Sequence, residues 1–233
     1  MLYIVSTPIG NLEDITLRAI TVLGNVDLIL AEDTRVTKIL LDRYNIKKGL
    51  VSYHQHSTLN KIERVIDELR KGKDIALVSD AGTPGINDPG GFLVRKILEA
   101  LPDVKIIPIP GANAAIAALS ISGVPADEFL YLGFPPHKKG RKKFFEQISQ
   151  AKQTIVFYES KYRILKALKE LKDIAKIGER PLIVARELTK QFETIYRGTA
   201  DEILMHLGRG NVLGEFVVVV SPKYKVKSEK PDE

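Results

Sequence analysis

The chain has 233 residues, a formal net charge of +6 and 44% hydrophobic residues, and it contains no cysteine. This length fits one large domain or two small ones, and the hydrophobic content excludes a disordered chain. The lack of cysteine excludes disulfides, thiolate metal sites and a cysteine nucleophile. Met1–Val5 has neither the basic nor the long apolar region of a signal peptide. No apolar run approaches the ~18 residues of a membrane span, so we expect a cytoplasmic protein that does not cross a membrane.

Strand and helix patterns alternate along the first half of the chain. Helices are expected from the N-cap Thr16 to Gly24, from Ile62 to Gly72, and over Leu93–Leu101. An Ala-rich helix follows Asn113. Strands are expected at Leu2–Val5, Val26–Ala31, Ile75–Val78 and Val104–Ile107. Their uninterrupted apolar runs are typical of parallel strands covered on both faces.

The second half has a different pattern. The alternation falters at Ser122–Asp127, which predicts a domain over residues 1–123, a second over 124–223 and a flexible tail over 224–233. Strands are expected at Phe129–Leu132, Thr154–Tyr158, Leu182–Arg186, Phe192–Arg197 and Glu215–Val220. The fold class is therefore α/β, with a mostly parallel first sheet and a mixed second sheet.

The most informative segment is the loop that follows the strand ending at Val78. Its sequence, SDAGTPGINDPGG, is about twice the usual 2–6 residues of such a connection and is dense in Gly, Pro, Asn and Asp. Three similar loops, Thr7–Asn11, Glu32–Arg35 and Pro108–Asn113, follow other predicted strands. Ligands of open α/β sheets bind at the carboxyl ends of the strands. The four loops therefore predict a ligand site, and the alternative is a set of purely structural turns.

Several familiar ligand motifs are missing. The chain has no G-x-x-x-x-G-K-[ST] loop, no G-x-G-x-x-G after its first strand and no G-x-S-x-G elbow. His54 and His56 form an H-x-H pair that could reach one metal ion, but no carboxylate cluster accompanies it. We therefore predict no metal site.

A run of cations lies in the second half. Five of the six residues from 138 to 143 are basic, and a second group, Lys223, Lys225 and Lys227, lies near the end. Like charges at this density repel one another unless solvent or a partner screens them. The run is either a solvated surface or a set of phosphate contacts. As RNA contacts we expect Lys138, Lys139, Arg141, Lys142 and Lys143.

Seven segments in order resemble those of the ribosomal RNA small subunit methyltransferase I family. They are STPIGNLEDITLRAI, AEDTR, VSDAGTPGINDPG, PIPGANAAIAALSISG, FLYLGFPP with its basic run, FYES and ARELTK, and the resemblance spans about residues 2–220. It implies the two-domain tetrapyrrole-methylase-like fold of class III S-adenosylmethionine methyltransferases, with the cofactor in a cleft between domains and usually a homodimer. It also implies 2′-O-methylation of a cytidine ribose in the decoding region of 16S rRNA, on free rRNA or on the 30S subunit.

The same resemblance implies a cofactor site made largely of main chain. The first loop would close on S-adenosylmethionine, the long loop would hold its methionine end and ribose, and the last loop would flank the adenosine. In that order the residues are Pro8, Ile9 and Gly10; Gly82, Thr83 and Ile86; and Gly111, Asn113 and Ala114. Gly and Pro loops suit this ligand because they expose backbone donors and acceptors.

Candidate catalytic residues come from two segments. Glu32 and Asp33 are the preferred carboxylates to accept the hydroxyl proton, with Arg35 orienting Asp33 or holding a phosphate. Arg186, Glu187 and Lys190 form a rival set, because a desolvated Lys190 could also act as a base. The alternative is that these residues form ion pairs between the domains.

The chain departs from the family pattern at two points. Lys161-Tyr162-Arg163 follows FYES where the family usually has Pro-His-Arg. Family members also commonly carry a further C-terminal segment, whereas the given sequence stops soon after its last expected strand. Two other functions stay open: a tetrapyrrole or protein methyltransferase of the same superfamily, and a non-catalytic RNA-binding module for ribosome assembly. The basic run favours RNA over the first, and the Gly82-Thr83-Pro84 loop argues against the second.

Overall fold

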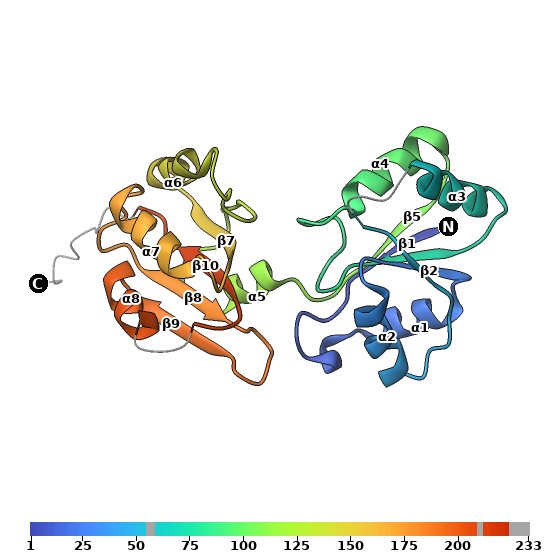
Figure 1. Cartoon of the computed structure of the whole chain (residues 1–233), viewed down its shortest axis with the longest axis horizontal. Coiled ribbons are helices and arrows are strands. Elements are labelled where there is room, and N and C mark those ends of the chain that lie inside the picture. Colours follow the sequence, from blue (N-terminus) through green and yellow to red (C-terminus); the bar gives the residue numbers. More distant parts are fainter. Residues whose placement is uncertain (55–58, 209–211, 224–233) are drawn as a thin grey trace, which may run out of the picture. The chain divides into compact units, whose positions relative to one another are not determined.

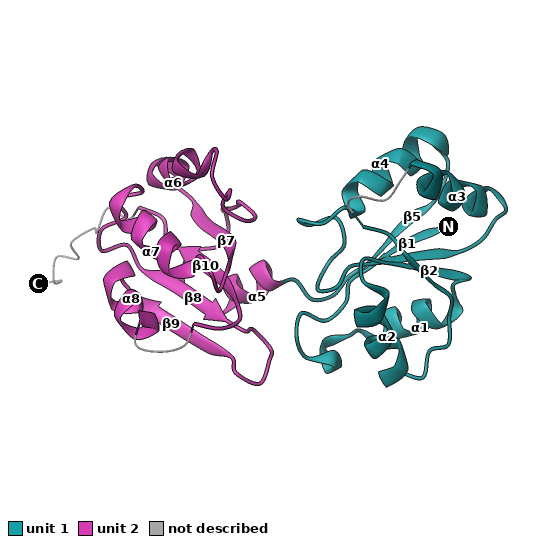
Figure 2. Cartoon of the chain, viewed as in Figure 1, with its two compact units in different colours: residues 1–113 teal, residues 114–233 magenta. Residues whose placement is uncertain are grey.

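The computed structural model describes residues 1–54, 59–208 and 212–223. The chain divides into two compact units, Met1–Asn113 and Ala114–Glu233 (Figure 2). This division lies before the boundary that the sequence predicts at residue 123. The difference is helix α5 (Ala114–Ser120), which contacts strands β7 (Thr154–Ser160) and β10 (Glu215–Val220) of the second unit. The predicted tail lies outside the described residues.

Unit 1 alternates strands with helices along the chain. Its elements are β1 (Leu2–Val5), a short 3-10 helix (Leu12–Asp14), α1 (Leu17–Asn25), β2 (Leu28–Ala31), α2 (Thr34–Arg43), β3 (Leu50–Ser52), α3 (Leu59–Arg70), β4 (Ile75–Val78), α4 (Gly90–Ala100) and β5 (Ile106–Ile109). All paired strands are parallel, in the spatial order β3-β2-β4-β1-β5 (Figure 1). The predicted parallel sheet is confirmed.

Helices cover both faces of this sheet. Successive side chains of a strand point to opposite faces, so each strand contributes side chains to both cores. In β4, Ala76 and Val78 pack with α1 and α2, whereas Ile75 and Leu77 pack with α3 and α4. Figure 1 shows the first helix pair below the strands and the second pair above them. Covering on both faces explains why the strands β2 (LILA) and β4 (IALV) are apolar at every position.

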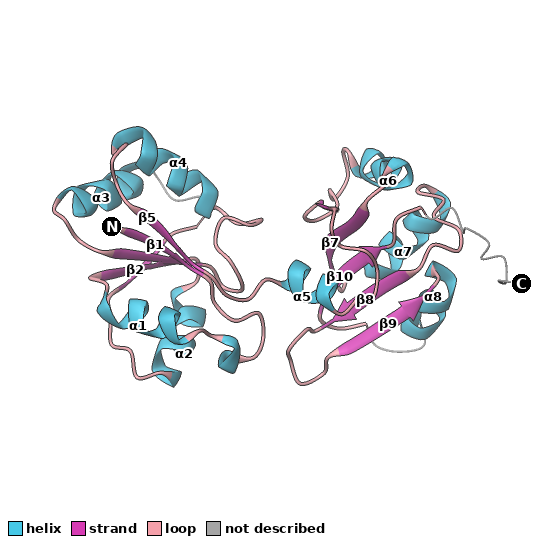
Figure 3. Ribbon diagram, turned by 180° about the vertical axis from the view of Figure 1, so that it is seen from behind, coloured by secondary structure: helices cyan, strands magenta, loops and turns pink. Residues whose placement is uncertain are grey.

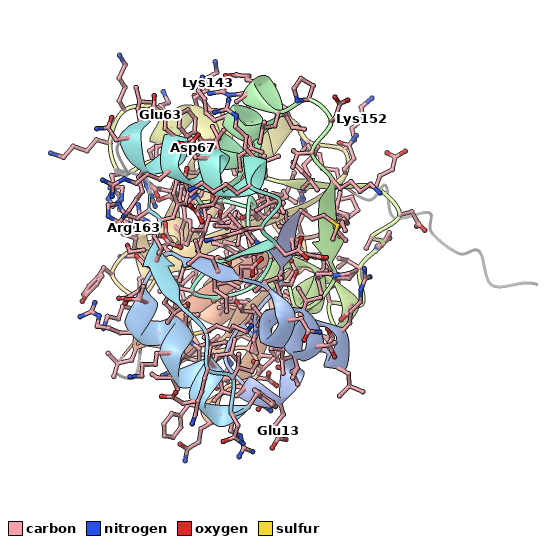
Figure 4. All side chains as sticks on the ribbon, turned by 90° about the vertical axis from the view of Figure 1, so that its right-hand side faces the viewer. Glu13, Glu63, Asp67, Lys143, Lys152 and Arg163 are labelled. Atoms are coloured by element: carbon pink, nitrogen blue, oxygen red, sulfur yellow. The ribbon has the colours of Figure 1, made fainter. Side chains whose placement is uncertain are left out.

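Local signals place the helices of unit 1. The Thr16 side chain accepts a hydrogen bond from the Ala19 N–H at 3.1 Å, so the predicted N-cap is confirmed. In α3 the predicted stripe of Ile62, Val65, Ile66 and Leu69 is buried. The polar residues Glu63 and Asp67 of the same helix point outward (Figure 4).

Unit 2 is built on a second sheet with the order β6-β7-β10-β8-β9. Strand β6 is parallel to β7 and the other pairs are antiparallel, so the predicted mixed sheet is confirmed. Figure 3 shows α5 on one side of the strands and the other helices on the opposite side, where Phe145, Phe157 and Phe216 fill the core. The remaining elements are β6 (Phe129–Tyr131), α6 (Arg141–Gln150), α7 (Ile164–Asp173), β8 (Leu182–Arg186), β9 (Thr194–Gly198) and α8 (Ala200–Gly208).

Five strands differ from their predicted bounds. Strand β2 begins at Leu28 rather than at Val26, β6 ends at Tyr131 rather than at Leu132, and β7 continues to Ser160 rather than ending at Tyr158. The strand expected at Val104–Ile107 is β5, at Ile106–Ile109, and it contains Pro108. Because β5 is an edge strand, its missing Pro108 N–H removes no necessary ladder bond. Strand β9, which pairs with β8, begins at Thr194 rather than at Phe192 and ends at Gly198 rather than at Arg197.

Candidate functional site

Three loops of unit 1 are tied together at the carboxyl edge of the sheet. They follow β4, β1 and β5, which are neighbours in the sheet. Thr7 and Gly82 exchange two main-chain hydrogen bonds, of 2.9 Å and 3.1 Å. The Ser6 hydroxyl donates to Thr83 Oγ1 at 2.9 Å, and that hydroxyl donates to the Ala112 carbonyl at 3.2 Å. The loops therefore form one connected structure and not separate turns.

The connections that follow β1 and β4 leave this edge of the sheet toward opposite faces. The loop after β1 leads to α1 on one face, whereas the loop after β4 leads to α4 on the other face. Adjacent parallel strands whose connections diverge in this way create the crevice where α/β proteins bind ligands. The predicted ligand loops thus lie at a topological switch point.

Backbone conformation explains the Gly and Asn content of the long loop. Gly82, Gly85 and Asn87 have φ of +83°, +88° and +69°, a region that glycine adopts freely and asparagine tolerates. The Asp88 carboxylate accepts hydrogen bonds from the N–H groups of Gly85 and Gly90, at 2.7 Å and 2.8 Å. The loop is therefore held in one shape by its own residues.

Two glycines have distinct packing reasons. A Cβ on Gly82 would lie 3.4 Å from Ile9 Cγ2 and 3.5 Å from the Ala112 oxygen, in the space among the three loops. A Cβ on Gly111 would lie only 2.8 Å from Ser6 Cβ. Gly111 thus lets the last loop pack on the first one, a role that the sequence does not reveal.

The other predicted ligand residues are distributed along the same loops. Gly10 and Ile86 are exposed, Ile9 and Asn113 are partly buried, and Pro8 is buried. The loops therefore present the apolar side chains of Ile9 and Ile86 together with exposed main chain at Gly10. This combination fits a ligand that has both a flat ring and polar ends. Ala114 is the first residue of α5 and belongs to unit 2.

Glu32 follows β2, next to the long loop. Partial burial raises the pKa of Glu32 above its ordinary value, and the nearby charges of Asp80 and Asp88 raise it further. A carboxylate with a raised pKa is a better proton acceptor near neutral pH. Asp80 and Asp88 were not among the predicted site residues, although both lie in the segment that the sequence singles out.

Asp33 has a structural task. Its carboxylate caps α2 by accepting the Arg35 N–H at 2.8 Å, and it also binds the Arg35 guanidinium at 2.6 Å. These hydrogen bonds from Arg35 lower the pKa of Asp33 to about 2. Its own N–H donates to the Asp80 carboxylate at 2.8 Å. Asp33 is therefore a weak base that orders the chain beside Glu32.

Lys190 does not have the environment of a neutral base. Partial burial alone would lower the pKa of Lys190, but hydrogen bonds to Glu215 and Glu187 outweigh it and the pKa is raised. The two ion pairs measure 2.9 Å and 3.0 Å. The rival assignment of Lys190 as a desolvated base is thus contradicted by its carboxylate partners, both in unit 2.

The basic run separates into two kinds of residue. Lys138, Lys139, Lys142 and Lys143 are exposed, and Figure 4 shows Lys143 reaching into solvent. Arg141 is only 4% exposed and binds Glu170 at 2.7 Å and Glu159 at 3.3 Å. A buried, doubly paired guanidinium does not reach a phosphate, so the prediction of Arg141 as an RNA contact is corrected to a structural role.

Neither a metal cluster nor a membrane helix is found where the chain is described. Within residues 1–54, 59–208 and 212–223, no three His, Asp or Glu side chains are grouped to hold a metal ion. His56 lies outside these ranges, and His54 is exposed after β3. The helices in the same ranges are too short or too polar to cross a membrane.

Comparison with known proteins identifies the family. The family model of Tetrapyrrole (Corrin/Porphyrin) Methylases matches residues 1–204. Three relatives carry the name Ribosomal RNA small subunit methyltransferase I. That of Escherichia coli O157:H7 is 48% identical over 94% of this chain and 77% of its own. That of Buchnera aphidicola subsp. Schizaphis graminum is 47% identical over 98% and 81%. The protein of Thermotoga maritima is 43% identical over 95% and 98%.

Solved structures support the fold. Diphthine synthase has a TM-score of 0.69 at 13% identity, covering 94% of this chain and 89% of its own. The cobalt precorrin-4 methyltransferase CbiF has a TM-score of 0.66 at 19% identity, covering 94% of both chains. The fold is thus shared by proteins with different printed names. By its sequence relatives and its fold, the chain belongs to the ribosomal RNA small subunit methyltransferase I family of the tetrapyrrole methylases.

Proposed function

We propose that this protein transfers a methyl group from S-adenosylmethionine to the 2′-oxygen of a cytidine ribose in the decoding region of 16S rRNA. The observation that carries the proposal is the identity of 43–48% to relatives named for ribosomal RNA methylation, over nearly the whole chain. The tied loops of unit 1 add a physical reason, because a purely structural RNA-binding module does not need Gly- and Pro-rich loops held together at the carboxyl edge of the sheet.

The three loops of unit 1 are the proposed cofactor site. When bound, S-adenosylmethionine supplies a methyl group already activated on a sulfonium. Ile9 and Ile86 offer apolar walls, and the exposed main chain at Gly10 offers polar groups, with Asn113 on the last loop. Both main-chain groups of Gly82 already pair with Thr7, so Gly82 contributes space for a close approach of the ligand. Pro8, Thr83 and Gly111 hold the loops in place, since Thr83 already bonds Ser6 and Ala112. Ala114 completes the set that the family resemblance implies.

Glu32 is the proposed proton acceptor. Transfer to a hydroxyl releases its proton, and a positioned base contributes roughly 10²–10⁴-fold to such a step. The raised pKa of Glu32, caused by burial and by the charges of Asp80 and Asp88, supports this choice over Asp33. Asp33 and Arg35 then act as a positioning pair at the start of α2.

The exposed lysines are the proposed phosphate contacts. Two of them, Lys138 and Lys139, lie at the end of the β6–α6 loop. The other two, Lys142 and Lys143, lie in the first turn of α6. The partner is 16S rRNA, free or within the 30S subunit, and we place the protein in the cytoplasm, where ribosomes are assembled. We also propose a homodimer, because two copies would double the basic surface that grips a large RNA.

Nucleoside analysis tests this function. Purified protein is incubated with S-adenosylmethionine and with either 30S subunits or naked 16S rRNA from cells that lack the modification, and the 16S rRNA is then digested to nucleosides. Mass spectrometry should find 2′-O-methylcytidine. A methyl group on the cytosine base, or none on the RNA, would refute the proposal.

A further inference from the structure

A buried ion network joins two loops of unit 2. The β6–α6 and β7–α7 loops leave the same edge of the sheet, because β6 and β7 are parallel neighbours. Glu159, whose side chain is fully buried, pairs with Arg163 at 2.9 Å and with Arg141 at 3.3 Å. Arg163 also donates to the Pro135 carbonyl and Arg141 to the Pro136 carbonyl, both at 3.2 Å. The two loops are therefore held in a fixed arrangement.

The outward residues of these loops, 134–139 and 161–162, form what we call the two-loop surface. Tyr162 is 84% exposed, and Phe134 is 46% exposed with its ring against Tyr158. The Lys161 ammonium lies 5.0 Å from the centre of the Tyr162 ring. Lys138 and Lys139 are exposed on the other loop. Neither stretch contains an Asp or Glu, so the surface combines positive charge with exposed rings.

This combination fits single-stranded RNA. Proteins that bind single strands pair cations that follow the phosphates with aromatic rings on which bases stack, a contact worth about 5-fold to 160-fold in affinity per base. An ordinary surface ion-pair role does not account for Lys138 and Lys139, which have no carboxylate partner within the described part of the chain. A fixed backbone also reduces the ordering that binding requires.

We propose that Tyr162 is a stacking platform for an unpaired base of the substrate RNA, while Lys138, Lys139 and Lys161 contact phosphates of the same strand. The inference rests on the proposed function for the identity of the RNA. Glu159, Arg141 and Arg163 then serve as positioning residues, since they are largely buried and hold the two loops together.

Binding and fluorescence measurements test the platform. A short single-stranded RNA with 2-aminopurine at successive positions is titrated with the full chain, and the wild type should quench the probe at one position. Tyr162→Ala should bind about 5-fold to 160-fold more weakly and lose the quenching, with an unchanged salt dependence because no phosphate contact is removed. Tyr162→Phe keeps the ring and should retain both affinity and quenching.

Two further variants complete the test. Phe192→Ala removes another exposed ring of unit 2, 68% exposed, and should leave RNA binding unchanged. Lys138→Ala should lower the salt slope and keep the quenching. Wild-type affinity and quenching in Tyr162→Ala, or equal losses in the Phe and Ala variants, would overturn the platform.

A methyl-transfer assay on 30S subunits separates this inference from the proposed function. If the wild type methylates the subunit but Tyr162→Ala binds RNA normally, only the platform is wrong. If the wild type quenches the probe but transfers no methyl group, the platform stands and the proposed function is wrong.

Discussion

Replacing Gly82 by alanine tests the cofactor site with a matched control. Gly82 has φ of +83°, so any L side chain there costs about 1–2 kcal/mol of backbone strain. The new Cβ would meet Ile9 Cγ2 at 3.4 Å and the Ala112 oxygen at 3.5 Å, which is the limit of ordinary contact. Domains are usually stable by about 5–15 kcal/mol, so the variant should remain folded.

The affinity for S-adenosylmethionine should fall much more than the stability. The added methyl group occupies the space among the three loops, where a glycine lets a ligand approach the main chain. We expect a loss of at least about tenfold, or about 1.4 kcal/mol, in calorimetric titration.

Gly72→Ala is the control for strain alone. Gly72 lies in the turn after α3, has φ of +81°, and a Cβ there would meet nothing within 4 Å. Both variants should unfold at similarly reduced denaturant concentrations, and only Gly82→Ala should lose cofactor. Wild-type affinity in a folded Gly82→Ala variant would refute the placement of the ligand at this loop.

Four other predictions follow from the structure and from the proposed function. Glu32→Gln should lower single-turnover rates by roughly 10²–10⁴-fold without weakening cofactor binding. The wild-type rate should fall as pH drops through the raised pKa of Glu32, and a Gln variant with the wild-type rate and acid limb would exclude Glu32 as the base. Lys138→Ala and Lys139→Ala should each reduce the log–log salt slope of RNA binding by ~0.7–0.9, and an unchanged slope would mean a merely solvated surface. Glu159→Ala should cost about 3–5 kcal/mol in urea unfolding because it removes the buried carboxylate that Arg141 and Arg163 share and leaves Arg163 without its ion pair, whereas the exposed Glu146→Ala should stay within about 0.5 kcal/mol. Sedimentation equilibrium at micromolar protein should give twice the chain mass, and a mass of 25.9 kDa throughout would contradict the homodimer.

Local signals in the sequence predict most of the fold. The Thr16 cap and the stripe from Ile62 to Leu69 depend on residues a few positions apart, and both are confirmed. Helix α2 and strand β3 were not predicted. The buried face of α2 begins with a polar residue, Thr37, and β3 has only three residues. Such short or mixed patterns do not stand out against the surrounding loops.

The sequence predicts where the loops of the site lie along the chain, but it does not predict the hydrogen bonds that connect them. Their Gly and Pro content predicts shaped turns, whereas the Thr7–Gly82 and Ser6–Thr83 bonds link segments far apart in the chain. Only the strand order brings these residues together, and composition does not reveal that order.

The sequence carries a local signal for the inward position of Arg141, although basic residues surround it. Arg141, Phe144, Phe145 and Ile148 are spaced as one face of a helix, and all are buried. The helical spacing places this arginine inward. Its partners Glu159 and Glu170 lie on other elements and could not be identified from spacing.

Radiolabelled methyl transfer tests the central claim most directly. The protein is given labelled S-adenosylmethionine together with 30S subunits, naked 16S rRNA or uroporphyrinogen, in parallel reactions. We predict that label enters the RNA of at least one ribosomal substrate, that it does not enter the tetrapyrrole, and that Gly82→Ala slows the transfer while Gly72→Ala does not. Label in uroporphyrinogen and none in either RNA would contradict the account.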